Sequence, residues 1–257
     1  MSSTHASARF DAIADNYARS EVHESSPSLT MLRALSDGRT DLDVCDVACA
    51  AGHSAFAFLG RAKLMCGVDP SPNMLRNFVA LGRARGAPVR AVEAYAESMP
   101  LPDQGFDFVV CRLAAHHFHD IARALAEFRR ILRPGGSVVI IDLQGDDDPE
   151  CDGVNHQLEV LHDPTHVRSY TVARWRELLE NAGLRIATLE RDLTERPGGV
   201  GLARWCDIAN SGDAAHAAMV ALLDATPQAT LDAIGVRRDD RGYTVPVRTC
   251  FIEAQAR

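Results

Sequence analysis

The sequence lacks long apolar runs and basic stretches, and each absence excludes a class of protein. Its longest apolar run, near residues 137–143, is far shorter than the ~20 residues of a membrane-spanning helix. The chain has 27 Lys and Arg against 35 Asp and Glu, which gives a formal net charge of −8. No stretch is basic enough to predict binding to nucleic acid or an anionic membrane. We therefore expect a small-molecule substrate, no nucleic-acid partner and no membrane.

A signal core and a regular cysteine pattern are also missing. Residues 1–8 are small and polar, without the apolar core of a signal peptide. The seven cysteines include no CxxC pair, and several lie inside apolar runs, where free cysteine behaves as a small buried hydrophobe. An odd count without paired spacing argues against a disulfide framework and against a zinc site. We expect a cytoplasmic protein without a metal site.

What the 257 residues do have is a regular alternation of apolar runs and helical patterns. Strands are predicted at 43–48, 63–69, 89–94, 106–112, 137–142, 184–193 and 245–254, and helices at 6–20, 29–35, 54–59, 72–85, 121–132 and 172–182. Such alternation predicts an α/β fold, in which a parallel sheet has helices on both faces.

Three segments fall outside this alternation. Residues 1–38 are predicted to form an N-terminal helical cap, and residues 145–170 and 196–241 are predicted cap or insertion segments. The acidic residues 145–152 are expected to be a surface loop. No low-complexity linker divides the chain, so residues 1–257 are expected to form one domain.

Two consecutive strand ends carry the pattern of a nucleotide pocket. The first apolar run passes into a turn of small residues that starts at Ala48, and the second ends at Asp69. In parallel α/β proteins the turn lies beneath the ligand, and the acid holds the ribose hydroxyls. Glycine is scarce in this turn, because Ala48 and Ala50 stand where glycine is expected and only Gly52 remains.

Several motifs occur together in a fixed order, which is more specific than any of them alone. They are Phe10–Tyr17, Asp46–His53, Gly67–Leu75, Glu97–Pro102 with Phe106-Asp107, Cys111–Phe118 and Leu132–Gly136. On these stretches the chain resembles class I S-adenosylmethionine-dependent methyltransferases, in the small-molecule and ubiquinone-type branch, with a degenerate first motif. The resemblance implies a Rossmann-like, doubly wound sheet of seven strands, mostly parallel, with an antiparallel last strand.

The resemblance also implies that S-adenosylmethionine is the cofactor. Tyr17 would reach the carboxylate of the cofactor, Asp69 would bind the ribose, and Met74 would pack on the adenine. Tyr95 stands where relatives usually have an aspartate that accepts a hydrogen bond from the adenine amino group. The remaining implied cofactor positions are Asp46, Ala48, Ala50, Gly52, Ala96 and the backbone of Arg112.

Candidate bases follow the fourth predicted strand, at the edge where open α/β proteins bind ligands. A methyl acceptor must be aligned opposite the sulfonium, and a hydroxyl or amine acceptor must also lose a proton. His116 and His117 are candidate catalytic residues because histidine titrates near neutral pH. The alternative is that they only pack at a helix start.

A second polar cluster precedes the predicted helix at 172–182. His162 is a further candidate base, and His166 and Arg168 are candidate substrate contacts. Trp205 is expected to form a cavity wall next to the substrate. The alternative is a capped loop whose polar groups satisfy the backbone.

Three function classes remain open on the sequence alone. The leading one is an enzyme that moves the methyl group of S-adenosylmethionine to O, N or C of a small molecule, in specialised biosynthesis. The second is a methyltransferase-like enzyme that transfers no methyl and catalyses an intramolecular cyclisation by displacement. The third is a non-catalytic partner subunit, and the sequence leaves open a monomer, a homodimer or a complex with another protein.

Overall fold

A computed structural model describes residues 9–11 and 26–256 of the chain. Its elements in chain order are α4 (Pro27–Ala34), β1 (Leu42–Val47), η1 (Ala55–Phe58), β2 (Ala62–Asp69), α5 (Pro72–Ala84), β3 (Val89–Glu93), β4 (Phe106–Arg112), η2 (Ala115–His117), α6 (Ile121–Ile131), β5 (Leu132–Leu143), α7 (Pro149–His162), α8 (Val172–Asn181), β6 (Leu184–Thr194), β7 (Val200–Gly201), α9 (Leu202–Ala209), α10 (Asp213–Ala225), α11 (Gln228–Ile234), β8 (Arg237–Asp239), β9 (Gly242–Val245) and β10 (Arg248–Ala256).

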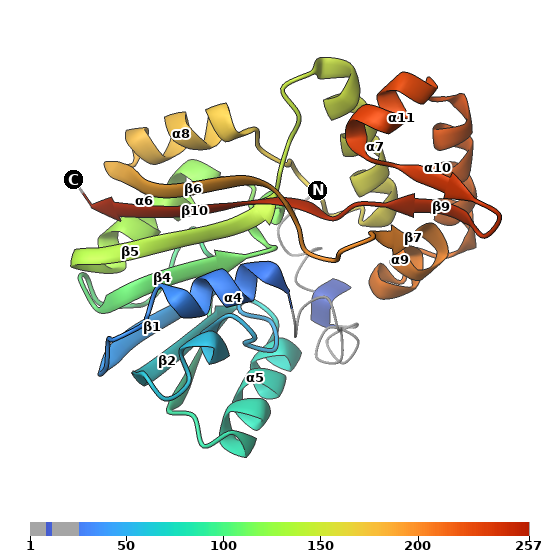
Figure 1. Cartoon of the computed structure of the whole chain (residues 1–257). Helices are drawn as coiled ribbons and strands as arrows, with labels where there is room; N and C mark the ends of the chain where they lie inside the picture. The colour runs from blue at the N-terminus through green and yellow to red at the C-terminus, as the bar shows by residue number, and fades with distance from the viewer. Residues whose placement is uncertain (1–8, 12–25, 257) are drawn as a thin grey trace.

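The main sheet has seven strands in the order β3-β2-β1-β4-β5-β10-β6. The strands from β3 to β5 pair in parallel, and β10 is antiparallel to both of its neighbours. Helices α6 and α8 cover one face, while α4, η1 and α5 cover the other (Figure 1). This arrangement confirms the predicted Rossmann-like sheet and its antiparallel last strand.

The core explains why the central strands are continuous apolar runs. All six residues of β1 are buried, because helices cover the sheet on both sides. On the α5 side, Phe78 packs between Gly52 and Gly67, where a Cβ atom would lie 2.2 Å and 2.6 Å from its ring. The two glycines therefore let α5 dock closely on the end of β1 and β2.

A second sheet, of order β7-β9-β8, lies beyond the end of the main sheet at which β10 begins (Figure 1). Together with α7, α9, α10 and α11 it encloses an apolar cluster that includes Trp205 and Met219. The helical patterns predicted within 196–241 are present, but this small sheet was not predicted.

Three predicted boundaries are wrong for local reasons. Residues 149–152 are helical and not loop, because the Asp148 side chain accepts hydrogen bonds from the first N–H groups of α7 and Pro149 occupies the first turn. The helix predicted at 54–59 is a single 3₁₀ turn, η1. The strand predicted at 245–254 is interrupted at Pro246, which has no N–H to donate to a sheet.

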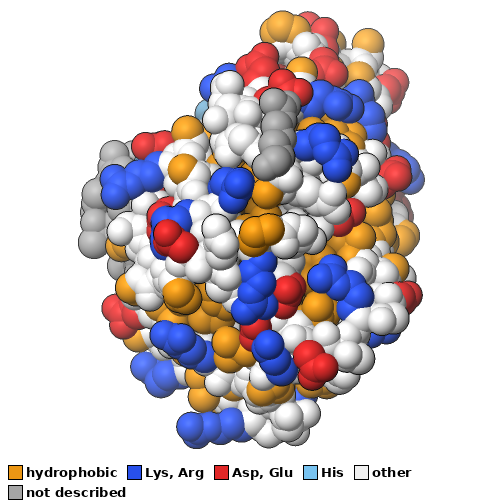
Figure 2. Space-filling view, turned by 90° about the vertical axis from the view of Figure 1, so that its left-hand side faces the viewer, with side chains coloured by type: hydrophobic (Ala, Val, Ile, Leu, Met, Phe, Trp, Pro, Cys, Tyr) orange, Lys and Arg blue, Asp and Glu red, His pale blue; other side chains and the backbone are white. Residues whose placement is uncertain are grey.

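The surface where the parallel strands begin carries side chains of both charges. Figure 2 shows Lys and Arg interspersed there with Asp, Glu and apolar side chains. Among the described residues, no helix is both long enough and apolar enough to span a bilayer. The opposite edge, where the parallel strands end, holds the cavities described next.

Candidate active site

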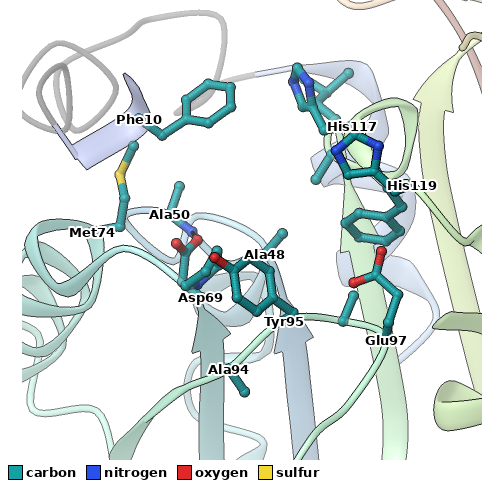
Figure 3. Close-up of a pocket in the computed structure, with 15 residues that line it drawn as sticks. Phe10, Ala48, Ala50, Asp69, Met74, Ala94, Tyr95, Glu97, His117 and His119 are labelled. Carbon is teal, nitrogen blue, oxygen red and sulfur yellow. Dashed lines mark hydrogen bonds between the residues drawn. The ribbon is translucent and has the colours of Figure 1, made fainter. Parts of the chain in front are cut away.

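A first cavity opens above the ends of β1, β2 and β4 and encloses about 780 Å³, part of it open to solvent (Figure 3). Its walls come from the turn after β1, the end of β2, the start of α5 and the segments that follow β3 and β4. The lining residues are Phe10, Ala48, Ala50, Asp69, Pro70, Met74, Ala94, Tyr95, Ala96, Glu97, Leu113, Ala114, His117, Phe118 and His119.

The turn after β1 keeps a left-handed backbone although its residues are alanines. Ala48 has φ 54° and Ala50 has φ 45°, a region that glycine adopts easily and residues with a Cβ adopt at a cost. The Ala50 N–H donates a 3.0 Å hydrogen bond to Asp69 Oδ2, drawn as a dashed line in Figure 3. The backbone of the turn is thus held in the conformation of a glycine-rich loop by a carboxylate from the next strand.

Asp69 ends β2 with its carboxylate at the cavity wall. Its Oδ1 accepts a 2.9 Å hydrogen bond from Ser71 N, and Oδ2 accepts the bond from Ala50. Burial raises the pKa of Asp69 to about 6, although the two backbone donors act in the opposite direction. Each carboxylate oxygen keeps a lone pair that a ligand hydroxyl can use.

The side chains that replace glycine and aspartate do not fill the cavity. The methyl groups of Ala48 and Ala50 and the ring of Tyr95 line its wall, and the Tyr95 ring lies between the sides formed by Asp69 and Glu97 (Figure 3). Tyr95 is 37% exposed. The predicted crevice therefore exists despite the added bulk.

Two predicted cofactor residues of the first motif serve the fold around the cavity. Asp46 is buried beneath the turn, where it accepts a 2.9 Å hydrogen bond from Ala55 N, and burial raises its pKa to about 8. Gly52 is required by the approach of Phe78. Neither residue lines the cavity.

The Arg112 side chain points away from the first cavity into a buried polar network. It donates to Ser28 Oγ at 3.0 Å and to Ser26 Oγ at 2.9 Å, and it lies 3.3 Å from a Glu195 carboxylate oxygen. The next residue, Leu113, has φ 52° and lines the cavity instead. Tyr17 lies outside the described residues.

A second cavity of about 750 Å³, part of it open to solvent, adjoins the first. Phe10, Leu113 and His117 line both cavities, so these residues form the boundary between them. The other lining residues are His116, Leu143, Glu159, His162, Asp163, His166, Val200, Trp205, Ile208 and Val247.

His116 forms a dyad with Asp142 at the floor of the second cavity. His116 Nδ1 donates to Asp142 Oδ1 at 2.5 Å, and the His116 backbone N–H donates to Oδ2 at 2.8 Å. Burial opposes the imidazolium, but the carboxylates around it, Asp142 first and then Glu159 and Asp163, outweigh burial and raise the pKa of His116. Since Nδ1 is occupied, Nε2 is the ring nitrogen left for a ligand.

His117 is a neutral histidine at the boundary of the cavities. Its Nδ1 lies 3.1 Å from the Thr165 carbonyl oxygen, which can only accept, so the proton is on Nδ1. Burial, followed by the neighbouring His116, lowers the pKa of His117 to about 3. The ring packs edge-on against Phe10, with 4.9 Å between centroids.

The cap side of the second cavity holds two further histidines. His162 stacks on Trp205 with a centroid distance of 3.9 Å, and burial lowers its pKa to about 3. His166 is 7% exposed, and neither of its ring nitrogens has a hydrogen-bond partner among the described residues. Arg168 pairs with Asp152 and lines neither cavity.

Comparison with known proteins decides the family. Residues 45–140 match a family model described as a methyltransferase domain. The uncharacterised methyltransferase YcgJ of Bacillus subtilis is 32% identical over 170 residues, which cover 66% of this chain and 67% of that protein. The chain belongs to the class I S-adenosylmethionine-dependent methyltransferases.

Other similarities to this methyltransferase agree with the fold. The uncharacterised Escherichia coli protein YafE is 34% identical over 142 residues, which cover 55% of this chain and 69% of that protein. The crystal structure of B. subtilis YcgJ has a TM-score of 0.81 at 24% identity and covers 90% of this chain and 98% of that one. The [4+2]-cyclase SpnF has a TM-score of 0.62 at 17% identity, over 89% and 79% of the two chains. Both structures show the shared fold alone.

The cavities of this methyltransferase bring together most predicted site residues. Ala48, Ala50, Asp69, Met74, Tyr95 and Ala96 line the first cavity, and His116, His117, His162, His166 and Trp205 line the second. Asp46, Gly52, Arg112 and Arg168 line neither. Within the described ranges, no three His, Cys, Asp or Glu side chains are arranged to hold a metal ion.

Several lining or supporting residues of this methyltransferase were not predicted as site residues, among them Asp142, Glu159, Leu113 and Phe10. Asp142 could have been found, because it ends an apolar strand at the same sheet edge as Asp69. Glu159 lies on α7, in a segment that was predicted only as a cap or insertion, and Leu113 carries no polar signal. Phe10 was noted only as part of an expected cap helix.

Proposed function

We propose that this enzyme binds S-adenosylmethionine in the first cavity and methylates an O, N or C atom of a small molecule in the second. One observation carries the proposal: the two cavities meet at His117, Leu113 and Phe10. A methyl donor and an acceptor held on either side of that boundary would face each other, which is the alignment that direct displacement needs. We further propose a cytoplasmic role in small-molecule biosynthesis.

The residues of the first cavity fit the parts of the cofactor. When bound, S-adenosylmethionine supplies a methyl group already activated on its sulfonium. Asp69 would accept hydrogen bonds from the ribose hydroxyls with its free lone pairs. Met74, Ala94 and Ala96 offer apolar contact to the adenine. The turn at Ala48 and Ala50 would lie under the methionine part.

The dyad in the second cavity suits the removal of a proton. Neutral His116 would accept the proton of a hydroxyl or amine acceptor at Nε2, and Asp142 would stabilise the imidazolium through Nδ1–H. His117 and His162 are weaker bases because burial lowers their pKa values to about 3. We therefore assign the base to His116 and the orientation of the acceptor to His117 and His162.

Calorimetric titration with S-adenosylhomocysteine tests the cofactor part of the proposal. We expect affinity in the micromolar range that weakens as the pH falls through the Asp69 pKa of about 6, because the protonated carboxyl accepts fewer hydrogen bonds. The Asp69→Asn variant should bind about tenfold more weakly, without this pH dependence. A folded sample that binds neither S-adenosylmethionine nor S-adenosylhomocysteine would sink the proposal.

A second candidate function is supported by the strained alanines of the cofactor turn. Ala48 and Ala50 keep left-handed conformations that favour glycine, whereas the His116–Asp142 dyad belongs to the second cavity. An intramolecular cyclisation by displacement would use only the second cavity and its base. Failure of the calorimetric test, in a protein that still binds small molecules in the second cavity, would favour this candidate.

A further inference from the structure

Glu159 is the one carboxyl group of the second cavity that has no partner among the described residues. The other acid of the lining, Asp163, accepts from Thr165 and pairs with Arg9, and Asp142, which lies outside the lining, accepts from His116. Glu159 projects from α7 into the lining, and no described residue forms a hydrogen bond or ion pair with its side chain.

Among the other lining residues of the cavity, only His116 can offer Glu159 a positive charge, and it shares that charge with Asp142. No Lys or Arg is part of the lining. Burial holds the pKa values of His117 and His162 at about 3 and that of His166 at about 2, so these rings are neutral near pH 7. The positive charge that His116 can carry is already balanced by Asp142.

An ionised carboxylate without a counter-charge is unfavourable in a cavity lined mainly by apolar residues and neutral histidines. Burial raises the pKa of Glu159 to about 7, and the charge of His116 only partly opposes this. A ligand cation beside Glu159 would keep the carboxylate ionised and supply its missing partner. A ligand carboxylate or phosphate would meet Glu159 with no cation nearby.

The remaining wall of the cavity is apolar. It is formed by Leu143, Val200, Trp205, Ile208 and Val247, and His162 stacks on one face of Trp205. A ligand with a hydrocarbon skeleton and one positive group would match both parts of the lining.

Resting on the proposed function, we infer that the methyl acceptor is a small amine that binds as its ammonium ion paired with Glu159, with its apolar skeleton against Leu143, Val247 and Trp205. The nitrogen becomes a nucleophile when neutral His116 takes its proton at Nε2. Through the pairing, Glu159 selects cationic over neutral and anionic acceptors. Its position in the second cavity, outside the lining of the first, separates this selection from binding of the cofactor.

Three probes that share a phenyl ring on a short chain separate the charge classes: phenethylamine, phenethyl alcohol and hydrocinnamate. Their dissociation constants are measured by ligand-observed NMR with the full chain, with and without S-adenosylhomocysteine. We expect phenethylamine to bind about tenfold more tightly than the alcohol, and hydrocinnamate to bind most weakly. In Glu159→Gln the advantage of the amine should disappear.

The control Glu190→Gln removes the same charge from the exposed side of β6 and should leave all three constants unchanged. Equal binding of the amine and the alcohol, tighter binding of hydrocinnamate, or an amine preference that survives in Glu159→Gln would overturn the inference. S-adenosylhomocysteine affinity, measured on the same samples, should not change in Glu159→Gln. If the wild type does not bind S-adenosylhomocysteine, the proposed function fails. The inference about Glu159 is tested separately, by the amine preference measured without cofactor.

Discussion

At the scale of single residues, the alanines of the turn after β1 show that a backbone conformation can persist when the residue type that favours it is gone. Ala48 and Ala50 hold positive φ values because the Asp69 carboxylate fixes the Ala50 N–H from the neighbouring strand. A left-handed alanine costs about 1–2 kcal/mol relative to its ordinary conformation. This cost is present in the folded state without any ligand.

Replacing Ala50 by glycine should therefore stabilise the protein. The relief of strain exceeds the extra entropy of glycine in the unfolded chain, so we expect a gain of about 0.5–1 kcal/mol and a melting temperature about 2 °C higher in thermal unfolding. The matched control is Ala51→Gly, at a fully buried position without positive φ, which should lower the melting temperature. Equal destabilisation by both substitutions would contradict the claim that Ala50 is strained.

The pH dependence of methylation is the second prediction at this scale. Only neutral His116 can accept a proton, so the rate should fall as the pH drops through its pKa, which Asp142 raises above the ordinary ~6.5. In Asp142→Asn the acidic limb of the pH–rate profile should move to lower pH, and kcat/KM for the acceptor should drop about a hundredfold. Unchanged S-adenosylhomocysteine affinity would locate the loss in the proton transfer. A limb that stays in place would exclude this dyad.

Residues that line a cavity were predicted well where a strand end positions them, and poorly where a distant segment does. Asp69 and Ala48 follow from the pattern of apolar runs, because parallel strands end at one edge of the sheet. Arg112, whose backbone was expected at the cofactor, lines neither cavity, and Ser28 and Glu195, which hold its side chain, lie far from it in the chain. Nothing local to Arg112 carries that information.

At the scale of elements, a buried polar network fixes α4 to the main sheet. Glu195 accepts hydrogen bonds from Ser28 at 2.8 Å and from Thr249 at 3.0 Å, and it pairs with Arg112. The network joins the start of α4, the end of β4, the segment after β6 and the start of β10. Both charged side chains are almost fully buried, so each depends on the other for its charge balance.

Removing one partner of this pair should destabilise the fold more than removing both charges. Arg112→Met leaves the Glu195 charge buried and unpaired, and we expect a loss of about 3 kcal/mol in the free energy of unfolding, measured by urea denaturation. The double variant Arg112→Met with Glu195→Gln should recover more than half of that loss. Equal stability of the single and double variants would mean that the charge of Glu195 is not the cause.

The ends of elements were predicted correctly where the sequence has one clear capping or helix-breaking signal. The end of α6 before Arg133-Pro134-Gly135-Gly136 is an example. The small sheet was missed because β7 has two residues and β8 has three, too few for an alternation to be detected. Such short strands form through pairing with β9, which is a property of the packed cap.

At the scale of the whole molecule, the main sheet packs against an apolar cluster on each face, and the cap is built around a third. Trp175 on α8 belongs to a cluster of the main sheet, and Trp205 on α9 belongs to the cluster of the cap. Contacts between the two regions border the second cavity, among them the 2.8 Å hydrogen bond from Val167 N to His116 O and the 3.1 Å contact of His117 Nδ1 with the Thr165 carbonyl oxygen. We propose on this basis that the chain unfolds as one domain.

The two tryptophans of the chain make this proposal testable, because each lies in a different cluster. Trp205→Phe leaves only Trp175, which reports on the main sheet, and Trp175→Phe leaves only Trp205, which reports on the cap. In urea, the fluorescence transition of each variant should coincide with its own transition by far-UV circular dichroism, because one cooperative unit loses all its structure together. A cap signal that changes at lower urea than the circular dichroism would instead identify the cap as a separate unit. If the chain is one cooperative unit, saturating S-adenosylhomocysteine should move both fluorescence transitions to higher urea by the same amount. A ligand of the folded state stabilises the entire unit that binds it.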